Sequence, residues 1–131
     1  MGRVVAGVLF LMLVGGIVSG DESAAPVIDT VFGLQRPKNE DVVCFRNNDV
    51  LRGTVLDETI SINTPYGLLA VPLRRCAGLS FEGEQANTET IVTVNFNRYT
   101  GIVMDRVIRF RVGESGEEMP IRKERVRQIL L

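Results

Sequence analysis

The side chains that could do chemistry in this chain are few, because its 131 residues include no histidine and only two cysteines. Without His there is no imidazole base, no His–Cys dyad and no His-containing zinc site. The remaining candidates for a hydrolase or a calcium site are carboxylates, above all Asp57 and Asp105. Both fall at predicted turns, where Asp bonds to the local backbone, and no loop has the alternating oxygen ligands that calcium favours. We therefore expect no enzyme, with no catalytic residue, no metal and no cofactor.

The two cysteines, Cys44 and Cys76, have 31 residues between them and so lack the C-x-x-C spacing that tunes thiol acidity. In an exported protein they could form a disulfide, because Cys44 on a first strand would face Cys76 beside the last strand of a closed barrel. The alternative is that each is a small buried apolar side chain. A second, similar stretch of the chain has Val92 at the position of Cys44, which favours this alternative.

Basic side chains gather near the C-terminal end, although the formal net charge of the chain is −1. They could contact an anionic envelope polymer, lipid headgroups or an acidic protein. They could equally form a solvated strand face, since Arg109 and Arg111 alternate with apolar residues. The near-neutral charge and the interleaved Glu residues argue against a nucleic-acid partner. The candidate contact residues are Arg109, Arg111, Arg122, Lys123, Arg125 and Arg127.

The N-terminal residues have the pattern of a cleavable signal peptide. Arg3 precedes an apolar run, Val4–Val18, and small residues follow at Val18-Ser19-Gly20. A membrane-spanning helix needs ~20 apolar residues, so this run is too short for an anchor. We expect residues 1–20 to be removed, leaving an exported protein, periplasmic or secreted, with no transmembrane segment. Residues 21–39 are rich in small and polar residues and predict a flexible lead-in, with a short strand at Val27–Phe32 as an alternative.

The rest of the chain reads as an internal repeat. Shifting the sequence by 48 positions aligns residues 42–83 with 90–131 without a gap, and seven of these 42 pairs are identical. The identical pairs include Gly53/Gly101, Asp57/Asp105 and Pro72/Pro120. Identities at turn residues and at the apolar positions of strands are what a structural duplication leaves. We therefore divide the chain into repeat 1, residues 40–83, and repeat 2, residues 89–131.

Each repeat predicts five short antiparallel strands separated by turn residues. Gly53 inside the second strand predicts a sharp bend, and Thr64–Gly67 predicts a tight turn. The stretch Arg122–Leu131 could instead be a short helix, because its apolar residues loosely fit helical spacing. The predicted strands are 42–45, 50–56, 59–63, 68–71 and 79–81 in repeat 1, and 91–94, 99–104, 107–112, 118–121 and 126–130 in repeat 2.

Repeat 1 carries a motif that resembles a family of small barrels. The motif is Asn48-Asp49-x-Leu51-x-Gly53-x-Val55 followed by Ile60-x-Ile62-x-Thr64-x-Tyr66-Gly67-x-Leu69-x-Val71-Pro72. It is similar to a repeat of the Sm-like or SH3-like type found in exported bacterial envelope proteins of unassigned function. Asn48 replaces the usual Gly, Cys76 replaces an Ile, and repeat 2 lacks the Tyr-Gly pair. The resemblance implies architecture and says little about activity.

These observations predict an all-β protein of two tandem small antiparallel barrel-like repeats after a cleavable signal peptide. A barrel of about 42 residues is too small to be stable alone, so the repeats should pack together or pair with another chain. Short barrels leave open strand edges, which invite strand addition. We expect a non-enzymatic binding or assembly module of the cell envelope with a protein or polymer partner, and Tyr66 joins the candidate contact residues. The alternatives are a structural homo-oligomer and, less favoured, a hydrolase.

Overall fold

The structure is a computed structural model that describes residues 27–82 and 88–131. Its elements are strands and two short 3-10 turns, which confirms the all-β prediction. The predicted signal peptide, residues 1–20, lies outside the described residues. Within those residues no helix is long and apolar enough to cross a membrane.

The two segments expected to be repeats contain the same series of elements. Segment 1 (residues 40–83) contains β3 (Asp41–Phe45), β4 (Val50–Val55), β5 (Thr59–Thr64), β6 (Gly67–Pro72), η2 (Leu73–Arg75) and β7 (Cys76–Ser80). Segment 2 (residues 89–131) contains β8 (Glu89–Thr93), β9 (Arg98–Val103), β10 (Val107–Val112), β11 (Glu118–Arg122), η3 (Lys123–Arg125) and β12 (Val126–Leu130). The helical alternative for Arg122–Leu131 is wrong, because β12 is a strand.

The strands form where apolar and polar residues alternate, as the sequence predicts. In β5, Ile60 and Ile62 are fully buried, and in β10 the equivalent residues Ile108 and Phe110 are fully buried. The residues between them point to the outer face of the sheet, because successive side chains of a strand alternate in direction. Val55 and Val103 join these four side chains in a single apolar core, so the two segments share one core.

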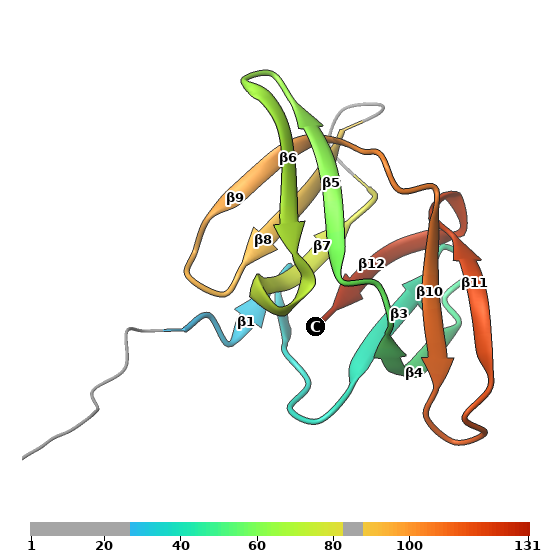
Figure 1. Cartoon of the computed structure of the whole chain (residues 1–131). Coiled ribbons are helices and arrows are strands. Elements are labelled where there is room, and N and C mark those ends of the chain that lie inside the picture. The colour runs from blue at the N-terminus through green and yellow to red at the C-terminus, as the bar shows by residue number, and fades with distance from the viewer. Residues whose placement is uncertain (1–26, 83–87) are drawn as a thin grey trace, which may run out of the picture.

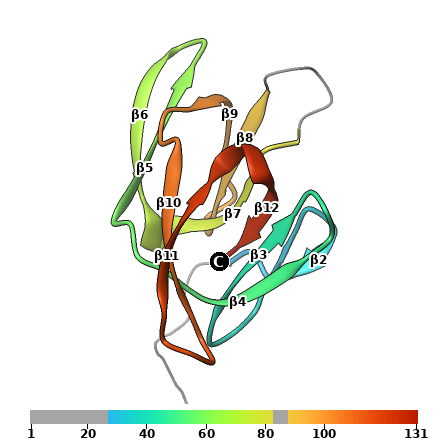
Figure 2. The same ribbon diagram turned by 90° about the vertical axis from the view of Figure 1, so that its right-hand side faces the viewer.

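The segments are interleaved in one ten-stranded antiparallel sheet with the order β11-β10-β4-β3-β12-β7-β8-β9-β5-β6 (Figures 1 and 2). The β10–β11 hairpin of segment 2 pairs with β4, and the β5–β6 hairpin of segment 1 pairs with β9. In the same way β12 pairs with β3, and β7 pairs with β8. The sheet therefore has two mixed halves. The β3 half comprises β3, β4, β10, β11 and β12, and the β8 half comprises β8, β9, β5, β6 and β7.

An approximate two-fold axis relates the two halves. It passes between β7 and β12, which pair in the middle of the sheet with Leu79 opposite Ile129. The irregularity between Cys76 and Gly78 against β8 recurs between Val126 and Gln128 against β3. Figures 1 and 2 show the tips of the β5–β6 and β10–β11 hairpins at opposite ends of the molecule.

The equivalence between the segments changes after the third strand. Ile62 pairs with Val103 as Phe110 pairs with Val55, an offset of 48 positions. The two 3-10 turns begin at Leu73 and Lys123, which are 50 positions apart. The offset between equivalent residues therefore grows by two at the β10–β11 connection, and the ungapped alignment is wrong beyond it. Pro120, which pairs with Arg109, is equivalent to Ala70, which pairs with Ser61, and is not equivalent to Pro72.

Gly53 and Gly101 occupy matching places, as the alignment predicts. A Cβ atom on Gly53 would overlap the carbonyl oxygen of Arg111, and one on Gly101 would overlap that of Asn63. Asn63 and Arg111 are themselves 48 positions apart. Each glycine thus allows the close approach of a strand from the other segment.

Asp57 and Asp105 act between the segments and not within their own turns. Asp57 Oδ2 accepts a hydrogen bond from the N–H of Arg109 at 2.9 Å, and Asp105 Oδ2 accepts one from the N–H of Ser61 at 2.7 Å. Each carboxylate therefore accepts a hydrogen bond from a strand N–H of the other segment, just beyond the point where the pairing between the two segments ends. The predicted structural role is correct, but the bond is to a distant strand.

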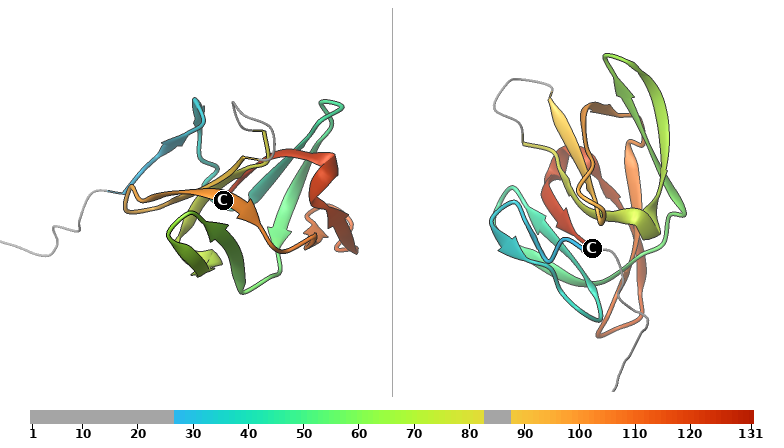
Figure 3. Two further views of the ribbon diagram at one scale, coloured as in Figure 1. Left: turned by 90° about the horizontal axis from the view of Figure 1, so that it is seen from above. Right: turned by 90° about the vertical axis from the view of Figure 1, so that its left-hand side faces the viewer.

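The described part of the predicted lead-in differs from the expected flexible chain. Residues 27–39 include the hairpin of β1 (Thr30–Val31) and β2 (Leu34–Gln35), and Val31 is buried with Val42, Val92 and Leu130. Gly78 has no side chain to clash with Val31 and Phe32 where the hairpin packs on β7. Figure 3 shows this hairpin (blue) and the β5–β6 hairpin (green) on opposite sides of β7–β9.

Candidate binding surfaces

The predicted basic residues do not form one surface. Arg109 and Arg111 lie side by side on the outer face of β10, where Arg109 Nη2 is 3.5 Å and Arg111 Nη2 2.9 Å from the carboxylate of Glu118. All three side chains are about half exposed. This charged face is internally compensated, and exposed pairs of this kind contribute little to stability.

Lys123 and Arg127 are tied into the structure. Lys123 Nζ donates to Glu89 Oε1 at 2.9 Å and to the carbonyl of Val103 at 2.7 Å, and its side chain is only 18% exposed. Arg127 donates to Asn48 Oδ1 at 2.6 Å and lies 3.5 Å from the carboxylate of Glu82. Neither cation projects freely from the surface, so both are poor candidates for ligand contact.

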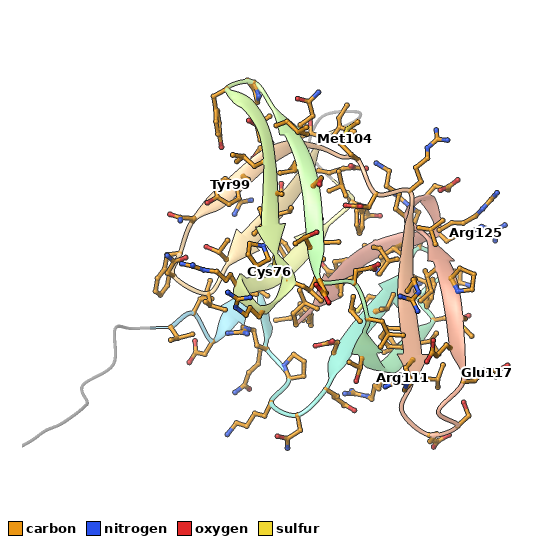
Figure 4. All side chains as sticks on the ribbon, viewed as in Figure 1. Cys76, Tyr99, Met104, Arg111, Glu117 and Arg125 are labelled. Carbon is orange, nitrogen blue, oxygen red and sulfur yellow. The ribbon has the colours of Figure 1, made fainter. Side chains whose placement is uncertain are left out.

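Arg122 and Arg125 share a groove of about 670 Å³ between the β3–β4 turn and β11. Its walls also include apolar side chains, among them Phe45, Leu51 and Met119. Asp49 and Glu124 line the same groove, so it has no single sign of charge. Arg122 and Arg125 therefore line a common depression, and Figure 4 shows Arg125 pointing outward.

Tyr66 lies at the tip of the β5–β6 hairpin and is 68% exposed. Beside it Leu68 is 67% exposed. Across β5 lie the exposed side chains of Ile102 on β9 and of Met104, which directly follows β9. Met104 is labelled in Figure 4 and donates its N–H to the carbonyl of Ser61. Leu68, Ile102 and Met104 were not predicted from the sequence, although Ile102 and Met104 flank buried Val103 and so had to face outward.

The outer faces of the two halves differ at equivalent positions. In the β8 half, the register aligns Ile102, Asn63 and Leu68 in one row across three strands. In the β3 half, the equivalent row is Thr54, Arg111 and Glu118. One face is therefore uncharged and partly apolar where the other carries an ion pair.

The two cysteines are free thiols, as in the alternative in which Cys44 and Cys76 are not bridged. Cys44 is on β3 and Cys76 is on β7, and strand β12 lies between these two strands. At about 4.8 Å between neighbouring strands, β3 and β7 are about 9–10 Å apart, which is beyond disulfide reach. Cys44 packs against the small apolar cluster that contains Val31 and Val42, and Cys76 belongs to the shared core that contains Ile60 and Phe110. Burial raises the pKa of the Cys76 thiol to about 12, so it stays protonated at neutral pH.

A second cleft, of about 580 Å³, opens beside η2 and the start of β3. Its charged side chains are three carboxylates and two guanidinium groups, from Asp41, Asp57, Glu58, Arg36 and Arg74. Burial raises the pKa of Asp41, and the hydrogen bond from the N–H of Val55 and the charge of Arg36 only partly oppose this effect. The sequence analysis did not single out Asp41, because its significance depends on burial.

Comparison of the chain with known protein families, curated proteins and solved structures finds no match.

Proposed function

We propose that this chain is a non-catalytic binding or assembly module of the bacterial cell envelope, which holds a protein partner by strand addition at the free edge of β6. The observation that carries the proposal is the difference between the two end strands of the sheet. β6 and β11 are equivalent, and each is paired on one side only. β11 has a proline in the middle of its free edge, whereas the proline of β6, Pro72, is the last residue of that strand.

The protection of β11 comes from Pro120. The N–H of Val112 donates to the carbonyl of Glu117, so the alternating ladder places the N–H positions of 118, 120 and 122 away from β10. Pro120 has no N–H to offer there, and proline is a recognised device for blocking an edge strand. The equivalent residue of β6 is Ala70, whose N–H faces outward with that of Leu68.

The surface beside β6 also favours a protein partner. No residue from Pro65 to Pro72 is charged, whereas the corresponding edge at β11 carries Glu118 and Arg122. Exposed Tyr66 and Leu68 flank the free edge. Backbone groups would give affinity and these apolar side chains would give specificity, as in other cases of strand addition. Placement in the envelope rests on the predicted signal peptide and on the resemblance of the motif.

Capture of partners from an envelope extract tests the proposal when matched variants are compared. Ala70→Pro should abolish capture, because it copies into β6 the proline that β11 already tolerates. Pro120→Ala serves as the control, since it changes the other edge and should leave capture intact. Equal capture by the wild type and Ala70→Pro would contradict a role for the β6 edge.

A structural homo-oligomer is the second candidate, and the uncharged sequence of β6 favours it. Two copies could pair β6 with β6 without bringing like charges together. Mass measurement across a range of concentrations separates this candidate from a monomer that binds another protein. The hydrolase alternative gains no support, because Asp57 and Asp105 are engaged by backbone N–H groups.

A further inference from the structure

The two halves place a carboxylate at the same point, at the start of their first strand. Asp41 Oδ2 accepts a hydrogen bond from the N–H of Val55 at 2.8 Å. Glu89 Oε1 accepts one from the N–H of Val103 at 2.7 Å. Asp41 and Glu89 are 48 positions apart, and so are the donors Val55 and Val103. The two carboxylates are therefore structural equivalents.

In the β8 half, this position holds an ammonium group. Lys123 Nζ lies 2.9 Å from Glu89 Oε1 and 2.7 Å from the carbonyl oxygen of Val103. The Glu89 and Lys123 side chains are only 14% and 18% exposed. The ammonium group is therefore held by a carboxylate and a carbonyl in a setting where charge-assisted hydrogen bonds are strong.

Leu73, which lines the cleft with Asp41, is the structural equivalent of Lys123. Both are the first residue of a 3-10 turn. Their backbone hydrogen bonds also correspond, since the Leu73 N–H donates to the carbonyl of Glu58 at 2.8 Å and the Lys123 N–H donates to the carbonyl of Arg106 at 3.0 Å. Among the residues described, no cation lies within 4 Å of the Asp41 carboxylate. Asp41 thus has the equivalent acceptor geometry without the equivalent ammonium.

The cleft of about 580 Å³ opens at this point, with Asp41 and Leu73 in its walls. Glu58, where the other half has Arg106, adds negative charge to the cleft. Arg36 lines the same cleft, and its guanidinium donates to the carbonyls of Ile28 at 2.7 Å and Leu131 at 2.8 Å. Arg74 also lines the cleft and limits its net charge.

We propose that this cleft binds a primary ammonium group of a protein partner at the Asp41 carboxylate, with its aliphatic stem against Leu73. A lysine side chain and a protein N-terminus both supply this chemistry. The proposed site does not depend on strand addition at β6, although Pro72 at the end of that strand also lines the cleft.

Titration of the protein with two blocked lysines tests the proposal and separates the two sources. Nα-acetyl-lysine amide offers only the side-chain ammonium, and Nε-acetyl-lysine amide offers only the α-ammonium. The readout is the carbon NMR signal of the Asp41 carboxyl together with the methyl signals of Leu73. We expect saturable shifts from at least one probe, and the doubly acetylated lysine amide should give none.

Two variants complete the test. Asp41→Asn retains an oxygen for the Val55 N–H and should weaken binding roughly tenfold or more, the effect of losing one charged hydrogen bond. Leu73→Lys should supply the ammonium from within the chain, lower the pKa of Asp41 and abolish binding of the probe. Absence of saturable shifts with both probes, equal shifts with the doubly acetylated compound, or unchanged binding in Asp41→Asn would overturn the proposal.

Discussion

Lys123 illustrates how burial and partners decide a residue's role. In the sequence it is one of a run of basic residues, but in the structure it joins η3 to β8 and β9 through Glu89 and Val103. Arg122, its neighbour, is exposed and lines a groove. Composition and spacing could identify the basic cluster but could not separate these two cases, because the difference lies in strands more than 15 residues away.

We predict that Lys123→Leu destabilises the protein by about 1–3 kcal/mol, since it leaves the largely buried Glu89 carboxylate without its cation. Denaturant unfolding gives the measurement. Arg122→Leu is the matched control and should change the free energy of unfolding by no more than about 0.5 kcal/mol. The double change Lys123→Leu with Glu89→Gln should recover part of the loss. If Lys123→Leu and Arg122→Leu lowered the free energy of unfolding equally, the Lys123–Glu89 ion pair would not contribute to stability.

The strands are the elements that the sequence predicted best. Alternation of apolar and polar residues placed β10 and β12 at their observed bounds, and it identified the buried side chains of β5 and β10. It could not predict the shift in equivalence after β10, because an ungapped alignment also produced identities such as Pro72/Pro120. Nor could it tell which strand lies beside which, since alternation specifies a buried face and not a neighbour.

At the level of the strands, Gly53→Ala and Gly101→Ala should each destabilise the protein by about 1–3 kcal/mol or more, because the new methyl group would overlap a carbonyl of the adjacent strand. Gly113→Ala is the comparison. Its Cβ would meet no atom closer than 3.3 Å, so a smaller loss is expected. Thermal melts of the three variants provide the measurement. A Gly101 variant as stable as the wild type would mean that β9 and β5 do not approach as closely as described.

The whole molecule is defined by the exchange of strands between segments. Residues 56–58 carry the chain from β4 to β5, and residues 104–106 carry it from β9 to β10, each without turning back onto the preceding strand. Asp57 and Asp105 lie on these connections and bond to the opposite segment. The sequence could not predict the exchange. A fold in which each hairpin packs within its own segment and a fold in which the hairpins are exchanged use the same strands and bury the same faces of them. Because we infer from the sequence that the segments are duplicates, a strand finds a similar pairing partner in its own segment and in the other one.

The exchange creates the features on which both proposals rest. It makes β6 and β11 the two ends of a single sheet, so their edges can be compared position by position. It also brings η2 and η3 to equivalent places, where Leu73 and Lys123 differ. Binding at the β6 edge and binding of an ammonium group near Asp41 would use different surfaces of one asymmetric molecule. Variants of one site should leave the other unaffected.

Cysteine cross-linking in the intact chain tests the exchange most directly. In a background with Cys44→Ser and Cys76→Val, Thr54→Cys is combined either with Arg111→Cys or with Asn63→Cys. Thr54 pairs with Arg111 in the structure, and Asn63 is the equivalent of Arg111 in segment 1. All of these strand positions are exposed, and directly paired residues lie within disulfide reach.

We predict that the Thr54→Cys/Arg111→Cys chain forms an intramolecular disulfide on mild oxidation and that the Thr54→Cys/Asn63→Cys chain does not. Mass spectrometry of peptides released by proteolysis identifies the linked residues. The opposite pattern, with a disulfide between positions 54 and 63 and none between 54 and 111, would show that β4 pairs with β5 within its own segment and would contradict the exchanged fold.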